Sequence, residues 1–135
     1  MRSYKFTINM APIAKARPKF RRARNGKVCT YTEKGTREAE DFVKMEVLQT
    51  YKDGPQQCPC MVTMTFKKSR PVDKKRLTSY PSRRPDIDNM AKLVMDALNG
   101  VIWEDDAQIV GLQAVKIWAQ EGEEPGIILE VSMIE

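Results

Sequence analysis

The feature that most constrains the fold of this chain is one helical pattern of apolar residues in its second half. The pattern recurs at positions i, i+3, i+4, i+7 and i+8, and consists of Met90, Leu93, Val94, Ala97 and Leu98. This spacing places all five side chains on one face of a helix, and Asn99-Gly100 directly afterwards is a typical helix end. A helix with a single apolar face must be buried against another layer of secondary structure.

Alternation of apolar and polar residues predicts strands in other segments. In residues 3–10 the apolar side consists of Tyr4, Phe6, Ile8 and Met10. Further strands are expected at residues 28–31, 60–67, 108–119 and 126–134. Because only the polar segment 120–125 separates the last two strands, we expect them to form a C-terminal hairpin.

A second helix is predicted to begin at Thr32 or Thr36, which are both suitable N-caps, and to end near Tyr51. Its expected apolar face consists of Ala39, Phe42, Val43, Val47 and Tyr51, with Glu46 as a charged exception. Residues 11–32 are rich in Pro and Arg and are expected to be mostly irregular. Together the patterns predict an α+β fold: a single small domain over residues 1–135, with a mixed β-sheet, two main helices and a C-terminal hairpin.

The composition excludes several classes of chemistry. The chain has no histidine, so it cannot contain a Ser-His-Asp triad, a histidine general base or a histidine-ligated zinc site. The three cysteines are odd in number and fit neither a disulfide framework nor a four-ligand zinc site. No apolar run approaches the roughly 18 residues of a membrane span, and the N-terminus lacks a signal-peptide core. We therefore expect a cytoplasmic protein with no membrane partner.

Positive charge is concentrated in two blocks. Residues 1–37 contain 11 basic residues against the single acid Glu33, and residues 67–84 contain 8 against Asp73. The rest of the chain has an excess of acids, so the net charge is only +5. Blocks of this kind are typical of nucleic-acid binding, although a merely solubilising surface is the alternative. The candidate DNA-binding residues are Lys15, Arg17, Lys19, Arg21, Arg22, Arg24, Lys74, Lys75, Arg76, Arg83 and Arg84.

Two carboxylates precede the patterned helix. Asp86 and Asp88 are two residues apart, so in an extended segment they project to the same side. Asp88 or Asn89 occupies the expected N-cap position. Asp88, Lys92 and Asp96 then follow at i, i+4 and i+8 on the helix face opposite the apolar one. Capping and a simple ion pair between Asp88 and Lys92 would explain those two residues, but not Asp86.

Further acids, Glu104, Asp105 and Asp106, directly follow the helix and precede a predicted strand. If that strand returns beside the start of the helix, Asp105 and Asp106 approach Asp86 and Asp88. Such a group of carboxylates is costly without a cation, and Mg²⁺ prefers oxygen ligands of this kind. Carboxylates beside basic blocks suit metal-assisted hydrolysis of a phosphodiester. A structural acidic turn is the alternative, and Asp73-Lys74-Lys75 is a weaker competing nuclease pattern.

The pattern D-x-D-N-x-x-K at Asp86–Lys92, the helix end at Asp96–Leu98 and the pattern D-D-x-Q at Asp105–Gln108 resemble the RusA family of Holliday-junction resolvases. The resemblance implies a homodimeric, bacterial or prophage endonuclease that uses Mg²⁺, with Mn²⁺ as a substitute, to resolve four-way DNA junctions. It implies that Asp86, Asp88, Asp106 and Lys92 are catalytic. It also implies that Asp86, Asp88, Asp105 and Asp106 hold the metal.

Three rival interpretations remain open at this point. The chain could be a non-catalytic nucleic-acid-binding protein, a metal-dependent nuclease with another substrate preference, or a protein-interaction module. Trp103 and Trp118 are expected to be core anchors rather than platforms for base stacking.

Overall fold

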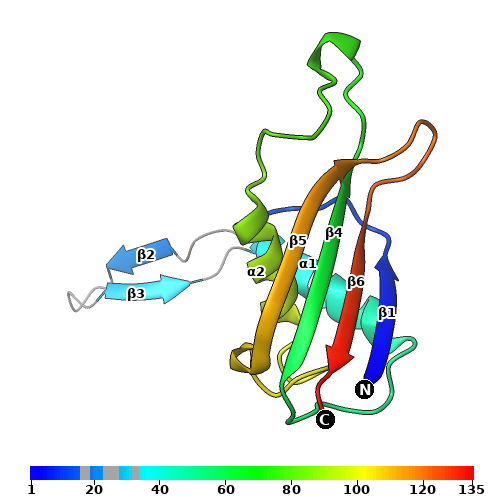
Figure 1. Cartoon of the computed structure of the whole chain (residues 1–135). Helices are drawn as coiled ribbons and strands as arrows, with labels where there is room; N and C mark the ends of the chain where they lie inside the picture. The colour runs from blue at the N-terminus through cyan, green and yellow to red at the C-terminus, as the bar shows by residue number, and fades with distance from the viewer. Residues whose placement is uncertain (16–18, 23–27, 32–33) are drawn as a thin grey trace.

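A four-stranded mixed sheet forms the centre of the computed structural model, which describes residues 1–15, 19–22, 28–31 and 34–135 (Figure 1). The strands are β1 (Arg2–Ile8), β4 (Cys60–Lys68), β5 (Ile109–Trp118) and β6 (Gly126–Met133). Their order is β1-β6-β4-β5; β6 runs antiparallel to β1 and β4, whereas β4 and β5 are parallel. The strands have the alternation that the sequence predicts, since Phe6 and Ile8 are buried while Lys5 and Thr7 are exposed.

Two helices cover one face of this sheet (Figure 1). They are α1 (Lys34–Leu48) and α2 (Ile87–Ala97). The five residues of the predicted α2 pattern are all buried, and Gly100 ends the turn that follows with φ of 79°. The predicted α+β fold class, with a mixed sheet and two main helices, is therefore confirmed.

The two C-terminal strands have a different arrangement from an ordinary hairpin. They are consecutive and run in opposite directions, but β4 lies between them and pairs with both. The expected C-terminal hairpin therefore takes a split form. The sequence of β5 and β6 specifies strands and a turn, but it does not specify which strand inserts between them.

The segment before α1 contains more regular structure than expected. β2 (Lys19–Arg22) pairs antiparallel with β3 (Val28–Tyr31) in a separate two-stranded sheet. The second strand was predicted, whereas Lys19–Arg22 was expected to be irregular. Its sequence, Lys-Phe-Arg-Arg, lacks the alternation of apolar residues that reveals most strands.

Helix α1 differs from its prediction at two positions. Thr36 is inside the helix and only 4% exposed, so it is not the N-cap, and Thr32 lies outside the described residues. Ala39, Val43 and Val47 are buried as expected, but Phe42 is 41% exposed. The helix is amphipathic with a narrower apolar face than the spacing indicates.

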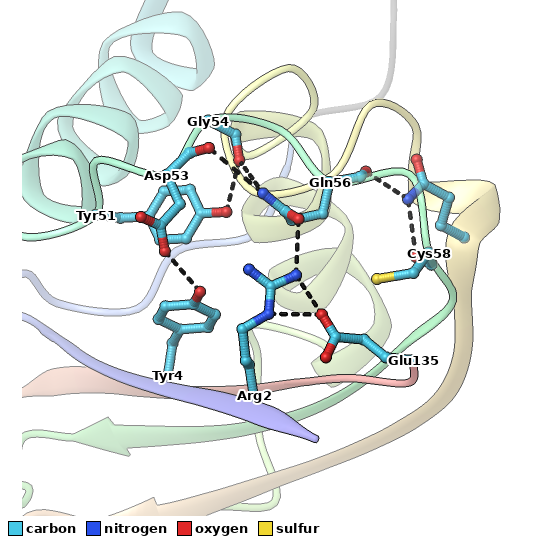
Figure 2. A network of polar contacts seen from close by, with 9 residues as sticks. Arg2, Tyr4, Tyr51, Asp53, Gly54, Gln56, Cys58 and Glu135 are labelled. Atoms are coloured by element: carbon cyan, nitrogen blue, oxygen red, sulfur yellow. Dashed lines mark hydrogen bonds and ion pairs between the residues drawn. The ribbon is translucent and has the colours of Figure 1, made fainter.

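A network of polar contacts ties both chain ends to the connection between α1 and β4 (Figure 2). Arg2 donates to Glu135 Oε1 at 2.6 Å and to Gln56 Oε1 at 2.9 Å. Tyr4 donates to Asp53 Oδ2 at 2.7 Å. The backbone of Gln56 in turn donates to the Ile102 carbonyl at 2.8 Å, so the network reaches the turn that precedes β5.

Across the described residues, no helix is both long enough and apolar enough to cross a membrane.

The position of β6 between two neighbours leads to a stability prediction. Leu129 is fully buried there, opposite Phe6 on β1 and Met64 on β4. Leu129→Ala should lower the free energy of unfolding by about 2–5 kcal/mol, because it leaves a cavity in the core. The matched variant Leu48→Ala removes a leucine that is 41% exposed, and it should cost less than about 1 kcal/mol. Urea denaturation measures both values, and equal costs would contradict this account of the core.

Candidate active site

The candidate site lies in the connection from β4 to β5, which contains a long loop, α2 and a short turn. Two lysines at the ends of these strands hold the loop where it enters α2. Lys116 Nζ donates to the carbonyls of Arg83 at 3.0 Å and Pro85 at 3.1 Å, and Lys68 Nζ donates to that of Arg84 at 2.8 Å. The backbone immediately before Asp86 is therefore fixed to the sheet.

Asp86 occupies the N-cap position of α2, whereas Asp88 or Asn89 was expected there. Its backbone is extended, with φ of −72° and ψ of 140°, and its carbonyl accepts from the Met90 backbone N–H at 3.1 Å. Its carboxylate makes no capping hydrogen bond, and no contact to another described residue occupies it. Capping therefore does not explain the Asp86 side chain, which is exposed and available to a ligand.

Asp88 lies in the first turn of α2 and is also exposed. Its Oδ1 accepts from the backbone N–H of Asn89 at 2.9 Å, which leaves the other carboxylate oxygen available. Within the described residues no ion pair joins Asp88 to Lys92, so the simple i,i+4 pair of the alternative interpretation is not formed.

Lys92 pairs with carboxylates from both ends of the connection instead. Its Nζ lies 3.3 Å from Asp96 Oδ1 on the same helix and 3.6 Å from Asp106 Oδ2, in the short turn that precedes β5. A hydrogen bond and the charge of Asp96, with a smaller contribution from Asp106, raise the pKa of Lys92. Lys92 is therefore a cation at neutral pH, while its side chain remains 54% exposed.

The turn that presents Asp105 and Asp106 is held by Gln108. The Gln108 Oε1 atom accepts from the backbone N–H groups of Glu104 at 2.9 Å and Asp105 at 3.0 Å. Its Nε2 donates to the Gln56 and Cys58 carbonyls at 2.7 and 3.0 Å. Gln108 was part of the D-D-x-Q pattern without an expected role of its own, although its position three residues after Asp105 is the spacing of a capping box.

The carboxylates were expected to converge as metal ligands, and the structure shows only part of that arrangement. Asp106 reaches α2 through Lys92, but no three Asp, Glu or Cys side chains of the described residues form a metal-ligand group. The donor atoms nevertheless fit Mg²⁺, which binds hard oxygen ligands and often takes only one or two carboxylates, together with water and substrate phosphate. Asp86, Asp88 and Asp106 provide such oxygens.

A hollow of about 620 Å³ lies at the start of α2, beside Asp86. Ala14, Arg84, Pro85, Asp86 and Asn89 line it. The backbone N–H of Lys15 donates to the Asn89 carbonyl at 3.0 Å, so the N-terminal segment forms one wall. The hollow thus places the Asp86 carboxylate and the Arg84 guanidinium beside the same space. A carboxylate can hold a metal ion and a guanidinium can hold a phosphate, so the two groups suit a phosphate bound next to a metal ion.

The side chain of Lys15 was expected to contact DNA, but the structure gives it internal partners. It forms an ion pair with Asp96 Oδ2, and its Nζ lies 3.1 Å from Glu40 Oε1 on α1. The side chains of Lys15, Asp96 and Glu40 are only 17–21% exposed. Lys15 therefore anchors the N-terminal segment to both helices. No sequence pattern pointed to Glu40, because its partner is 25 residues away.

The other candidate DNA-binding residues fall into two groups. Lys74, Lys75, Arg76, Arg83 and Arg84 are exposed on the loop before α2. Arg17 and Arg24, and the side chains of Lys19, Arg21 and Arg22, lie outside the described part of the chain. In the competing pattern, Asp73 caps the short helix η1 (Lys74–Arg76) by accepting from the Lys75 backbone N–H at 3.0 Å, which explains that acid structurally.

Comparison with known proteins identifies the family. The family model of endodeoxyribonuclease RusA matches residues 9–132, a range that contains every residue of the candidate site. This chain belongs to the RusA family. It is also 33% identical, over 95% of its own length and 96% of the relative's, to the uncharacterised protein YqaN of Bacillus subtilis (strain 168). Membership of a family of endodeoxyribonucleases supports DNA as the partner of this chain.

The Lys15–Asp96–Lys92 contacts lead to a pH-dependent prediction. Burial alone would raise the pKa of Asp96, but hydrogen bonds from Lys15 and Lys92 outweigh it and lower this pKa. The contacts therefore stabilise the fold fully above the unfolded pKa of about 3.9 and lose their effect as the pH falls through the lower folded value. Asp96→Asn should cost about 1–3 kcal/mol at pH 7, and this difference from wild type should shrink below about pH 4.

Urea denaturation at pH 7 and through the range from about pH 5 to pH 3 measures this difference. The matched control is Asp41→Asn, on an exposed position of α1, for which we expect a change below about 0.5 kcal/mol. A cost of Asp96→Asn that stays constant over the whole pH range would contradict the proposed stabilisation by the ionised carboxylate.

Proposed function

We propose that this chain is a Mg²⁺-dependent, structure-selective endonuclease that resolves four-way DNA junctions by paired phosphodiester hydrolysis, in DNA recombination and repair. The proposal treats residues 1–135 as a single endonuclease domain. One observation supports it most directly: Asp86 and Asp88 present carboxylates at the start of α2, and Lys92 on the same helix contacts Asp106 from the far end of the connection. The match to the RusA family supports the nuclease class.

Asp86, Asp88 and Asp106, with Asp105 assisting, are the residues that would hold Mg²⁺, and Mn²⁺ is a chemically suitable substitute. Bound there, the metal supplies Lewis-acid stabilisation of the charge that develops on the phosphate oxygens. Arg84 lines the same hollow as Asp86 and positions a phosphate by charge. Hydrolysis adds water at the phosphorus and breaks one P–O bond of the backbone, and the leaving oxygen receives a proton.

Lys92 acts in this reaction as a cation. Asp96 and Asp106 raise its pKa, which favours the protonated form of Lys92 at neutral pH. Its exposed ammonium can instead stabilise negative charge on the phosphate. Asp96 pairs with Lys92 and with Lys15 and is therefore a positioning residue for this ammonium.

Cleavage of a labelled four-way junction, beside linear duplex and flap controls, tests the proposal. Wild type should make paired cuts near the crossover with Mg²⁺ and none with EDTA. Asp88→Asn should lower the cleavage rate by about 100-fold or more, because it removes a metal ligand. Asp73→Asn makes the same chemical change outside the candidate site, and it should retain activity.

Each other result selects a different interpretation. Junction binding without cleavage by wild type would indicate a non-catalytic binding protein. Equal cleavage of all three substrates would indicate a nuclease with another substrate preference. Loss of cleavage in Asp73→Asn but not in Asp88→Asn would move the active site to the competing pattern.

A homodimer completes the proposal, because a four-way junction offers two strands for paired cuts and C2 symmetry suits two equal sites. β5 is an edge strand of the sheet, and it exposes 64% of Val110, 46% of Leu112 and 38% of Val115. Edge strands with exposed apolar side chains are disfavoured in monomers and favour association.

Sedimentation equilibrium should therefore give twice the mass of one chain for wild type. Leu112→Glu should shift the equilibrium to the monomer and reduce paired cleavage, whereas Val72→Glu, on a fully exposed loop position, should leave the mass unchanged. A wild-type monomer at micromolar concentrations would overturn the dimer.

A further inference from the structure

A second, smaller cavity lies beside the loop that joins β4 to α2. Its volume is about 210 Å³, and none of its lining residues lines the hollow beside Asp86. Trp118 forms one wall, and four cations, Lys68, Lys75, Arg76 and Arg83, line the rest together with small polar and proline residues. Among the residues that the structure describes, no acidic side chain lines this cavity. We call it the Trp118 pocket.

The Trp118 ring is held in place but is not part of the core. Trp118 is the last residue of β5, is only partly buried and does not belong to the central apolar cluster, contrary to the expected core role. Its Nε1 donates to the Thr78 carbonyl at 2.7 Å, which fixes the loop against the ring. Lys68 Nζ lies 5.8 Å from the ring centroid in a cation–π contact. The orientation of the ring is thus set before any ligand arrives.

The cations of the pocket are not neutralised by the protein. Within the described residues, the side chains of Lys75, Arg76 and Arg83 form no hydrogen bond or ion pair, and all three are exposed. Lys68 donates to a backbone carbonyl, and burial, together with the charge of Lys116, lowers its pKa. Like charges around one small space repel each other, and an anion in that space removes the repulsion.

The size and chemistry of the pocket together define its ligand. Its volume is below the about 300–1,000 Å³ of sites for drug-sized molecules, so it fits a single base and not a length of duplex. An aromatic ring beside unpaired cations is the combination that binds single-stranded nucleic acid, in which bases stack on the ring and cations hold the phosphates. Bases within a duplex are stacked on each other and cannot reach the ring.

We propose that the Trp118 pocket binds one unpaired nucleotide of the DNA substrate, with its base on the Trp118 ring and its phosphate beside Lys75, Arg76 and Arg83. This inference rests on the proposed function in taking DNA as the substrate. It adds a second contact, separate from the cleaved phosphate, that favours DNA with unpaired or easily opened bases over continuous duplex.

Tryptophan fluorescence tests the pocket without any cleavage. The chain has two tryptophans, and Trp103 is fully buried with its Nε1 donating to Asn99. In EDTA, saturation with an oligothymidylate should quench the emission of wild type, and Trp118→Phe should remove the response. Trp118→Ala should weaken binding of this single strand by about 5- to 150-fold, the range measured for loss of one base-stacking contact.

A pair of adjacent lysines provides the matched control for charge. Lys75 lines the pocket and Lys74 does not, although both belong to η1 and both are exposed. Lys75→Gln should weaken single-strand binding and reduce the magnitude of the salt slope by about 0.7, the value for one phosphate contact. Lys74→Gln should change both quantities less. Fluorescence anisotropy of a labelled oligothymidylate measures affinity and slope in the same experiment.

Two results would overturn the pocket: unchanged tryptophan emission at saturation, or equal effects of Lys74→Gln and Lys75→Gln. The wild-type emission requires no variant, so a Trp118→Ala protein that fails to fold leaves the test intact. If the protein cleaves junctions but its tryptophan emission does not change with the oligothymidylate, the proposed nucleotide site is wrong and the proposed nuclease function stands. If the emission is quenched but the protein cuts no DNA, the nuclease function is wrong and the nucleotide site stands.

Discussion

The parallel pairing of β4 with β5 is the constraint on which the rest of the structure depends. Two parallel neighbours cannot be joined by a tight turn, so the chain must cross from one end of the sheet to the other through a long connection. Here that connection contains the basic loop, α2 and the turn at Asp105–Asp106. Every described residue of the candidate active site lies on it or on a segment that packs against it. The apolar face of α2 fixes the connection to the sheet, because its burial is possible in only one orientation.

Basic and acidic residues occupy separate parts of this connection. The loop before α2 is basic, and the carboxylates begin at Asp86, where the helix begins. Hydrogen bonds from Lys68 and Lys116 to the backbone just before Asp86 mark the boundary. A nuclease needs cations that hold a polyanion and carboxylates that hold a metal, and an ion pair between Arg84 and Asp86 would occupy both side chains. The backbone between them is held by Lys68 and Lys116, and the Asp86 carboxylate stays free although Arg84 is only two residues away.

The sequence was sufficient for the local patterns and for the motif, but not for the contacts between distant segments. The alternation in β1 and the α2 pattern depend on neighbours within one element, so their spacing reveals them. Lys15 has partners on two helices, and its role as an anchor depends on which segments the fold brings together. The same reason explains the position of β4 between β5 and β6. Asp86 was recognised as a site residue because the expected N-cap was Asp88 or Asn89, which left Asp86 without a structural role. That Asp86 itself is the N-cap could not be predicted, because it depends on the exact residue at which the helix begins.

The internal use of some cations changes how the basic blocks are interpreted. Lys15, Lys68 and Lys116 all use their ammonium groups within the protein, either on carboxylates or on backbone carbonyls. Their positive charge therefore organises the fold more than it recruits DNA. Within the described residues, the cations without internal partners concentrate on the loop before α2, next to both cavities. Because long-range attraction follows the net charge of a region, the proposed function requires this loop to attract the DNA toward the spaces beside Asp86 and Trp118.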